Sequence, residues 1–529
     1  METKRYSLKP TGLIAAVAMS LVAGSAVAQG VADALRFNRN DLVGTARQQA
    51  MGGAFGALGA DLSTVTINPA GLGVYRATEM GLTLGVNAIN NESRYYDSKA
   101  NEDRVRVPFS QIGFAFNNSL MREETTGLVG STFYVGYNRI ANYAGNEKYV
   151  DPFSHNSLLD YFCTEEQRKA SMTGGLAYDA WMMNDTTFVN EVGDEIPISY
   201  NVWENYLGNG KLDVTFRQDG ADGSGLVMVN KKVNTRGSKG DISFAYAANI
   251  SNKVFVGGSL SIIALGYEET MLHQEVFDGY TVVANAPTSY TYRSYLDQNG
   301  AGVNFKLGVI VKPVNALRLG FALHSPTFLS LNEKYYAELN NPNHPTGRVE
   351  RTVDFESEYR YRSPSRIIAS IAGVIGHYGL ISVDYERQNE AKSKFKADDD
   401  DLTDYQEDAA MDGINEVMKN YILQASNTLR VGAEVSVFQP MYLRLGDRMK
   451  TSPITSDYYY TKPKDTAISG GIGYRMNNFF IDATYVCGKR VGDYWVMPDT
   501  SEGYIYETNF PAKLTTKTHS AVVTVGFRF

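Results

Sequence analysis

The sequence predicts an all-β protein, a 14-stranded antiparallel transmembrane β-barrel with an N-terminal hatch, or plug, inside its lumen. Apolar and polar residues alternate down to the last residue, short turns alternate with long polar loops, and a Gly/Ala-rich stretch precedes the first strand. The mean hydropathy of −0.27 resembles that of a soluble protein. A barrel hides its lipid-facing residues in alternation, so this average agrees with the predicted fold.

The N-terminus has the pattern of an export signal. Lys4, Arg5 and Lys9 precede an apolar run, and Ala26 to Ala28 provides a small-residue cleavage site. We therefore expect a signal peptide over residues 1–28, a hatch over 29–77, and a barrel with long extracellular loops over 78–529. No later run reaches the roughly 20 apolar residues of a membrane helix, so the mature chain would cross the membrane as strands.

Charge and cysteine content argue against two classes of protein, nucleic-acid binders and disulfide-framework proteins. Removing the signal peptide takes the net charge from −8 to about −10, whereas nucleic-acid binding favours a basic face. Cys163 and Cys487 are too few for a disulfide framework, and the sequence leaves their pairing open. We expect no metal and no cofactor, and a monomer in the outer membrane.

The stretch before the first strand predicts the hatch. Residues 50–60 hold eight Gly or Ala in eleven positions, which offers little apolar surface for a core and calls for enclosure by other elements. The four residues Asn68, Pro69, Ala70 and Gly71 then fix a turn, because proline restricts both its own φ and the residue before it.

Strand periodicity separates an outer face from a lumenal face. In the last run, one side is formed by Ala521, Val523, Val525, Phe527 and Phe529. We expect the barrel-assembly machinery to recognise the terminal aromatic, Phe529. Charges facing lipid would cost about 2–4 kcal/mol each, so charged residues of the opposite parity must face the lumen. The inward cations are the candidate ligand-binding residues, since a carboxylate in a lumen needs a cationic partner: Lys306, Arg318, Arg430, Arg444 and Arg448. Glu434, Asp384 and Asp482 are also inward, and pairing of the cations with such carboxylates is the alternative.

Counting strands gives fifteen runs when residues 353–361 and 366–375 are separate. An even number is needed if both ends lie in the periplasm, so the two are joined with a bend at Pro364, which gives fourteen. The long loops include residues 144–240. They also include an acidic run, Asp398 to Asp401, interpreted as a solvated loop, and an amphipathic helix over 405–423.

The hatch tetrapeptide and the order of the strand motifs resemble the FadL/TodX-type family of outer-membrane transporters for long-chain fatty acids and other hydrophobic compounds. The strand motifs are Leu317-Arg-Leu-Gly320, Ser363-Pro-Ser-Arg-Ile367, Leu429-Arg-Val-Gly432 and Gly470-Gly-Ile-Gly-Tyr474. The resemblance implies passive uptake, lumenal binding and lateral exit at an inward kink of the third strand. Here that strand is Leu128 to Tyr143, and Gly130, Gly136 and Asn138 are candidates for the gap. The loop over 144–240 is longer than the family leads us to expect.

Other functions stay open at this point. A structural or adhesive barrel would act through its extracellular loops, and uptake of haem or another hydrophobic ligand would use histidine or methionine ligands. Catalysis is not expected, since the six histidines form no nucleophile–base grouping. The expected partners are therefore a hydrophobic small molecule, outer-membrane lipid including lipopolysaccharide, and the assembly machinery at Phe529.

Overall fold

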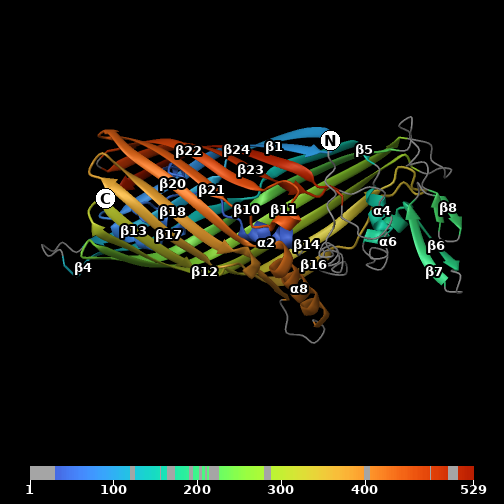
Figure 1. Ribbon diagram of the computed structural model, residues 1–529, viewed down its shortest axis with the longest axis horizontal. Coiled ribbons are helices and arrows are strands. Elements are labelled where there is room, and N and C mark those ends of the chain that lie inside the picture. Colours follow the sequence, from blue (N-terminus) through green and yellow to red (C-terminus); the bar gives the residue numbers. More distant parts are fainter. Residues whose placement is uncertain are drawn as a thin grey trace.

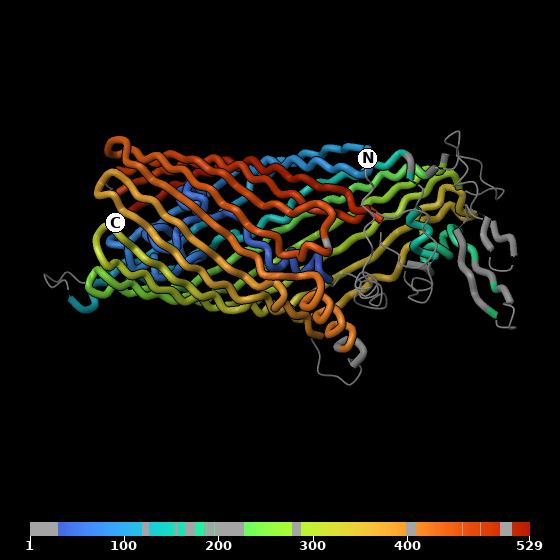
Figure 2. Tube along the Cα trace, in the orientation of Figure 1, coloured from blue at the N-terminus to red at the C-terminus, as the bar shows by residue number. Residues whose placement is uncertain are grey.

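The computed structural model shows a closed antiparallel β-barrel that encloses an N-terminal segment (Figures 1 and 2). It describes residues 30–119, 126–154, 157–163, 173–189, 195–201, 205–208, 211–213, 226–278, 287–397, 405–476, 478–497 and 510–529. The predicted signal peptide, the run Asp398 to Asp401 and one of the six histidines, His155, lie outside these residues. Within them, no helix is both long enough and apolar enough to span a membrane.

The wall has fourteen strand positions, as the periodicity predicted. The bend at Pro364 is confirmed, because β16 and β17 follow one another in the wall beside β14 and β13. The last strand pairs with the first from Glu79↔Arg528 to Arg94↔Lys513, which closes the barrel. In order, the positions are β1 (Glu79–Tyr95), β2/β3 (Ser98–Arg106, Phe109–Ser119), β4/β5 (Leu128–Asn142, Gly145–Ser154), β10 (Leu226–Ile250), β11 (Val254–Asp278), β12 (Ser289–Val314), β13/β14 (Leu317–His324, Phe328–Asn340), β16/β17 (Phe355–Arg362, Arg366–Ile375), β18/β19 (Gly379–Asn389, Lys394–Ala397), β20 (Ala425–Phe438), β21 (Met441–Lys450), β22 (Lys464–Arg475), β23 (Phe479–Tyr494) and β24 (Ala512–Arg528).

An apolar band surrounds one part of the barrel. On β10 the outward residues from Ile242 to Ile250 are apolar, whereas those from Asn230 to Arg236 are polar. On β12 the outward residues are apolar from Ala301 to Val311 and include Phe305 and Leu307, which are 58% and 63% exposed. A band of about ten residues matches a tilted strand crossing a bilayer, so the protein is a transmembrane barrel of the outer-membrane type.

Several segments expected to be polar loops are strands that continue beyond the band. The sequence placed Gly240 at the end of a loop, yet β10 begins at Leu226, and β14 occupies residues expected to be loop. Alternation continues there with a polar outer face and an apolar inner face. The inner face packs with α4 (Leu158–Phe162) and α6 (Thr173–Asp179) around buried Val227, Val229, Tyr149, Leu159 and Phe162. Two short hairpins, β6/β7 (Met183–Val189, Glu195–Asn201) and β8/β9 (Asn205–Gly208, Lys211–Asp213), lie nearby in the chain, and β15 (Glu350–Arg351) pairs with β14.

The predicted amphipathic helix is present as α8 (Tyr405–Val417), followed by the helical turn η4 (Met418–Ile422). Figure 1 shows α8 projecting from the side of the barrel. Met411, Ile414 and Met418 are buried against Phe395 of β19. The helix therefore packs on the outer rim with its apolar face, whereas Ala409 is exposed.

The N-terminal segment, residues 31–77, passes from the outer mouth down through the lumen. It holds α2 (Val31–Asn38), α3 (Ala46–Ala50), η1 (Thr64–Thr66) and η2 (Pro69–Val74). The short helices η3 (Glu390–Lys392) and η5 (Ser456–Tyr458) lie elsewhere in the chain. Almost every residue between Gly44 and Gly73 is buried, by the wall rather than by a core of its own. The segment approaches the wall at strand glycines. A Cβ on Gly446 would lie 2.0 Å from the backbone nitrogen of Gly52, and one on Gly320 would lie 2.2 Å from the carbonyl of Gly56.

Candidate functional site

The outer mouth contains a cavity of about 620 Å³, which we call the mouth cavity. Its walls are helix α2, the rim near η4, and the upper ends of several strands. Arg36 of α2 stacks on Tyr267 with its guanidinium carbon 3.6 Å from the ring centroid. Much of the lining is apolar, as a hydrophobic ligand requires: Val31, Leu35, Tyr143, Tyr267, Ile422, Ile454, Trp495 and Leu514.

Exposed aromatics stand beside this cavity. Tyr460 meets both Trp495 and Phe510 edge to face, with ring centroids 5.8 and 5.7 Å apart. All three are more than a third exposed. The three rings therefore form an exposed apolar surface beside the cavity.

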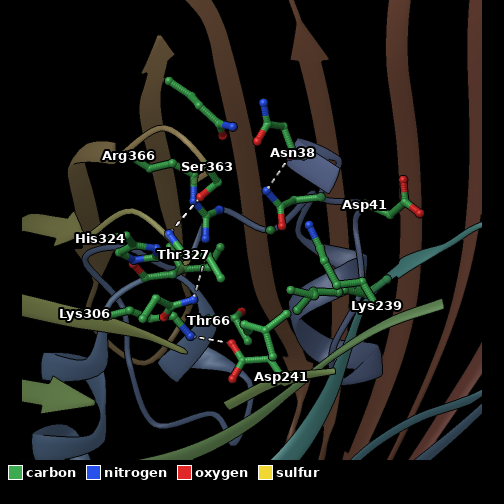
Figure 3. A pocket seen from close by; sticks show the side chains of 18 of the residues that line it. Asn38, Asp41, Thr66, Lys239, Asp241, Lys306, His324, Thr327, Ser363 and Arg366 are labelled. Carbon is green, nitrogen blue, oxygen red and sulfur yellow. Dashed lines mark hydrogen bonds and ion pairs between the residues drawn. The ribbon is translucent and has the colours of Figure 1, made fainter. Parts of the chain in front are cut away.

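Below the mouth lies a second, smaller cavity of about 70 Å³, which we call the basic cavity. Figure 3 shows Lys239, Lys306 and Arg366 converging on it from different strands. Arg430 and Arg448 also line it, whereas its only carboxylates among the described lining residues are Asp41 and Asp241. The cavity is therefore rich in cations, although it is large enough only for a small group such as a carboxylate.

Each cation of the basic cavity has a partner. Lys306 donates to Asp241 and to Ser261 (2.8 Å), and Arg430 donates to Glu386 at 2.7 Å. One terminal nitrogen of Arg430 is buried and has no hydrogen-bond partner. Lys239 donates to the carbonyl oxygen of Phe37 at 2.7 Å rather than to a carboxylate. Arg430 and Lys239 thus retain capacity for an anion.

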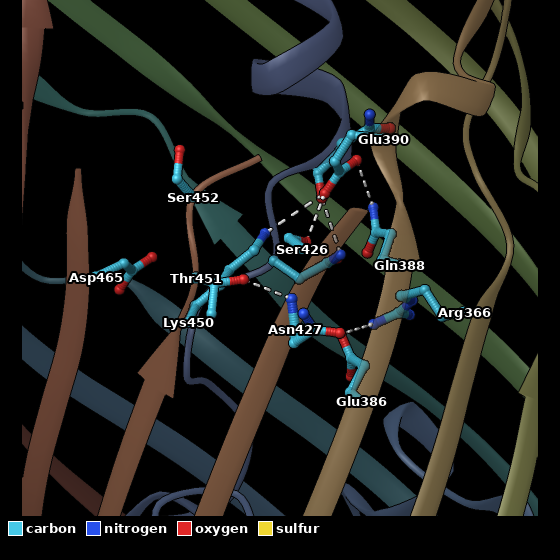
Figure 4. Close-up of polar contacts among 12 residues, drawn as sticks. Arg366, Glu386, Gln388, Glu390, Ser426, Asn427, Lys450, Thr451, Ser452 and Asp465 are labelled. Atoms are coloured by element: carbon cyan, nitrogen blue, oxygen red, sulfur yellow. Dashed lines mark hydrogen bonds and ion pairs between the residues drawn. The ribbon is translucent and has the colours of Figure 1, made fainter. Parts of the chain in front are cut away.

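A carboxylate network borders this cavity. Figure 4 shows Glu390 accepting from Gln388 and Ser426, with the ammonium of Lys450 3.7 Å away. Glu386 lies between Arg430 and Arg366, the second at 3.9 Å. These pairs fix the positions of the basic side chains and offset part of their charge.

Three of the five predicted cations therefore meet at the basic cavity, namely Lys306, Arg430 and Arg448. The other two contact the N-terminal segment or its anchors. Arg318 donates to the carbonyl of Leu58 at 2.8 Å. Arg444 donates to Glu434 and Asp482 at 2.6 and 2.5 Å, and Glu434 also accepts from Arg47 of α3.

The predicted hatch tetrapeptide is fully buried. The Asn68 side chain accepts from the backbone N–H of Ala70 and donates to the carbonyl of Gly56 at 2.6 Å, which caps η2. Pro69 begins this turn, and its backbone lies so close to β11 that a Cβ on Gly257 would be 2.6 Å away.

The wall is interrupted between its second and third strand positions. β3 pairs with β4 only up to Gln111↔Asn138, and no backbone ladder joins β2 to β5, both of which are described throughout. β4 and β5 nevertheless stay paired with β10 on their other edge. The sheet is therefore open on one side of the third strand above Asn138.

Side chains cross this interruption in place of a ladder. Arg104 of β2 donates to the carbonyls of Gly145 and Thr235 at 2.9 and 2.8 Å, and Asn91 of β1 donates to the carbonyl of Asn146 at 2.6 Å. Arg139 of β4 donates to the carbonyl of Phe109 at 2.9 Å. A seam held by side chains opens at lower cost than a continuous ladder would.

The predicted gap residues lie at different heights along β4. Asn138 ends the β3–β4 ladder and donates to the hydroxyl of Tyr134 at 3.2 Å. Gly136 lies two residues lower, where a Cβ would meet that hydroxyl at 2.2 Å. Gly130 is at the far end, within the continuous ladder opposite Ser119. The interruption begins above them.

A third cavity of about 260 Å³, which we call the side cavity, lies against the interruption. Its lining includes Ala144 and Gly145, at the junction of β4 with β5, and Asn91 and Ile89 of β1. It shares part of its lining with the mouth cavity: Arg39, Tyr143, Glu147, Thr235, Asp465, Arg490, Leu514 and Thr516. The two cavities are therefore neighbours along one side of the lumen.

The sequence did not single out Lys239, Arg366, Glu147 or Arg104. Lys239 has the inward parity of Asp241, but we placed it in a loop, and Arg366 follows the proline bend. Arg104 acts across the seam, which sequence does not reveal. Glu147 lies at the edge of the side cavity beyond the apolar band, and burial raises the pKa of its carboxyl to about 7.

The cysteines and histidines have other surroundings. No disulfide joins Cys163 to Cys487. His273 lies 2.7 Å from Glu275, and His324 lies 2.9 Å from the carbonyl oxygen of Ile67. Among the described residues, no group of three or more His, Cys, Asp or Glu side chains has an arrangement that could hold a metal ion.

Comparison with known proteins identifies the fold through structure. No protein-family model matches the sequence, and no curated protein matches it significantly. The toluene transporter TodX of P. putida superposes with a TM-score of 0.50 at 12% identity, covering 92% of this chain and 99% of TodX. A FadL homologue of Pseudomonas aeruginosa gives 0.51 at 12% identity, covering 93% and 99%. A deltaS2 mutant of the TodX monoaromatic hydrocarbon channel gives 0.51 at 12% identity, covering 92% and 100%. The chain therefore has the fold of the FadL and TodX barrels, as its sequence motifs implied.

Proposed function

We propose that this protein is a passive outer-membrane channel for hydrophobic small molecules. The observation that carries the proposal is the contact between the mouth cavity and the side cavity, which together run from the outer surface to the interruption in the wall. An apolar ligand would collect at the exposed aromatics, enter the mouth cavity, and leave through the seam between β2 and β5 into the bilayer, where it is most stable.

We infer that long-chain fatty acids are the favoured substrates. The structural neighbours are named for toluene, for monoaromatic hydrocarbons, and as a FadL homologue. A neutral hydrocarbon gains nothing from cations, whereas a carboxylate gains charge-assisted hydrogen bonds from Lys239 and Arg430. The five predicted cations keep this role as candidates, with Lys306, Arg430 and Arg448 at the basic cavity.

The N-terminal segment would act as the hatch. It fills the lumen below the cavities and lies directly against wall glycines, so straight passage to the periplasmic end is blocked. Lateral exit needs only that the seam at Arg104 and Asn91 opens. Asn38 lines the basic and mouth cavities, and Asp41 lines the basic and side cavities, so movement of this part of the segment would link the basic cavity to the other two.

An uptake assay tests the proposal. Cells that lack the protein are complemented with the wild type or with Ala144→Trp, which fills part of the side cavity at a position outside the strands. We expect A144W to lower oleate uptake at least tenfold while oleate binding to the purified barrel stays within threefold. The matched control is Ala264→Trp, which adds the same bulk to the lipid-facing side of β11.

The outcome separates this function from a structural or adhesive role. That alternative is favoured by one observation, the packed outer part formed by the strand extensions with α4 and α6. If cells without the protein take up oleate at the same rate as cells with it, the channel proposal is wrong. If uptake needs the protein but is insensitive to A144W, the lateral route is wrong.

A further inference from the structure

A group of cations lies on the outer surface just beyond the apolar band, on the side formed by β23, β24 and β1. Lys489, Lys513, Lys517 and Arg94 are all exposed and point outward. On β24 the band ends near Ala521, and Lys517 lies four residues, about 13 Å of strand, beyond it. These side chains therefore reach the level of lipid headgroups rather than the lumen.

The strand register places like charges directly opposite one another. Lys489 pairs with Lys517 across β23 and β24, and Lys513 pairs with Arg94 across β24 and β1. Arg94 in turn pairs with Lys99 of β2. Like charges at directly opposed positions destabilise a sheet unless an anion lies between them.

Three carboxylates on this surface are already engaged. Glu92 forms an ion pair with Lys99 at 3.1 Å, and Asp103 accepts from the side chain of Asn90. Asp493, which is opposite Lys513, accepts from the backbone N–H groups of Tyr460 and Thr461. In the part of the chain that the structure describes, no carboxylate oxygen lies within 4.0 Å of the charged nitrogens of Lys489, Lys513, Lys517 or Arg94.

Two of these cations, Lys517 and Arg94, act together with Lys99 on one side chain. The hydrogen bond from Lys99 holds the pKa of the Glu92 carboxyl below its usual range, and the charges of Lys99, Lys517 and Arg94 add to this effect. Three cations on three strands therefore act on a single exposed point. A headgroup with more than one phosphate could contact both the Lys489–Lys517 pair and the Lys513–Arg94 pair.

We propose that Lys489, Lys517, Lys513 and Arg94 form a docking surface for the phosphorylated headgroup of an outer-leaflet glycolipid, the chemistry of lipid A. The lipid is favoured over a soluble anion because the cations border the apolar band, so a lipid bound there keeps its acyl chains on the band. This surface lies on the outer face of the wall, so lipid binding there is independent of ligand uptake through the lumen.

Titration of the purified barrel with lipid A tests the surface. The probes are diphosphoryl lipid A, its dephosphorylated form, and inorganic phosphate. For the double variant Lys489→Gln and Lys517→Gln we expect about a thirtyfold loss of affinity for diphosphoryl lipid A, from roughly 1 kcal/mol for each cation near an anionic surface. Wild-type protein should bind the dephosphorylated lipid much more weakly, and inorganic phosphate only in the millimolar range.

The matched control removes two outward cations from another side of the barrel. Arg293→Gln and Lys334→Gln on β12 and β14 make the same charge change, and we expect binding within twofold of wild type. Heat-modifiable migration on gels verifies that both double variants fold. Equal loss in both double variants, no loss in K489Q/K517Q, or equal binding of dephosphorylated lipid A would overturn the proposal. Inorganic phosphate binding as tightly as the lipid would also overturn it, because the ligand would then be a free anion.

Discussion

Lys239 is the cation of the basic cavity whose removal leaves no buried carboxylate without a partner, because it donates to a backbone carbonyl. We predict that Lys239→Met weakens oleate binding about tenfold, since a hydrogen bond to a charged group contributes roughly 1.5–3 kcal/mol. Binding of a neutral hydrocarbon should not change. Fluorescence displacement with both ligands gives the two affinities.

The same pair of ligands decides the substrate class. If K239M weakens the binding of both ligands equally, the substitution has disturbed the lumen generally. Lys239→Arg, which keeps the charge, serves as the control. If the affinity for neither ligand changes, the carboxylate does not bind in the basic cavity. Neutral hydrocarbons, for which the structural neighbours are named, then become the better candidates.

Glu147 should make oleate binding weaker as the pH rises. Its pKa is raised to about 7 by burial, so its carboxyl is neutral below that pH and negative above it. Glu147 lines the mouth and side cavities, so it repels a fatty-acid carboxylate that enters them only above pH 7. We therefore predict that oleate binds about fivefold more tightly at pH 6 than at pH 8, which corresponds to roughly 1 kcal/mol.

Burial also lowers the pKa of the Lys239 ammonium, to about 7, so the comparison is made in the Lys239→Met background. There Glu147→Gln should remove the remaining dependence and bind oleate at pH 8 as K239M does at pH 6. The titration is repeated with a neutral alcohol of the same chain length, for which both proteins should be insensitive to pH. A wild-type affinity for oleate that is constant from pH 6 to 8 would contradict the prediction.

Parity predicted which charged residues face the lumen but not which partners they would find. Arg444 reaches Asp482 past β22, where a Cβ on Gly473 would lie 2.5 Å from the Arg444 guanidinium and 2.3 Å from the Asp482 carboxylate. A two-residue period carries no information about such contacts across an intervening strand. The sequence therefore predicted which cations face the lumen, and only the folded structure showed that three of them line one cavity.

At the scale of elements, the N-terminal segment depends on the wall glycines it touches. We predict that Gly446→Ala displaces the segment, because the new Cβ would lie 2.0 Å from the backbone nitrogen of Gly52, which no side-chain rotation can relieve. Overpacking of this kind costs about 1–3 kcal/mol. Planar-bilayer recordings should show a larger ion conductance than for the wild type.

Gly373→Ala on β17 is the control, since nothing lies within 4 Å of a Cβ at that position. Its conductance should match that of the wild type. Equal conductance of G446A and the wild type would mean that the segment tolerates displacement at β21 and is held by its other contacts.

The elements themselves were largely predictable where alternation was strict. The strand ends were not, because the rule used to end a strand was the onset of polar residues, and β10 through β12 remain paired far beyond that point. Their outward faces are solvated there while their inward faces form an apolar core with loop helices. Composition alone does not distinguish a solvated strand from a polar loop. The position of the break, between β2 and β5, was not predicted for a similar reason, because the sequence of an edge strand does not show which of its backbone groups lack a hydrogen-bonded neighbour.

At the scale of the whole molecule, the apolar band fixes how the barrel sits in the membrane. Leu307 lies in the middle of the band on β12 and is 63% exposed. We predict that Leu307→Arg destabilises the folded barrel by about 2–4 kcal/mol in lipid, because a charge at mid-depth loses its hydration. Urea titration of refolding into phosphatidylcholine vesicles measures the change.

The control places the same charge on the same face above the band. Asn234→Arg lies on the outward side of β10, between Lys232 and Arg236, where water solvates it, and we expect a change below about 0.5 kcal/mol. The difference between the two variants should vanish in detergent micelles with short chains, which adapt to the protein. If L307R and N234R are equally tolerated in vesicles, the band is not the membrane-spanning surface. Both the lateral exit into the bilayer and the lipid-docking surface beyond the band would then lose their physical basis, because each depends on where the bilayer ends.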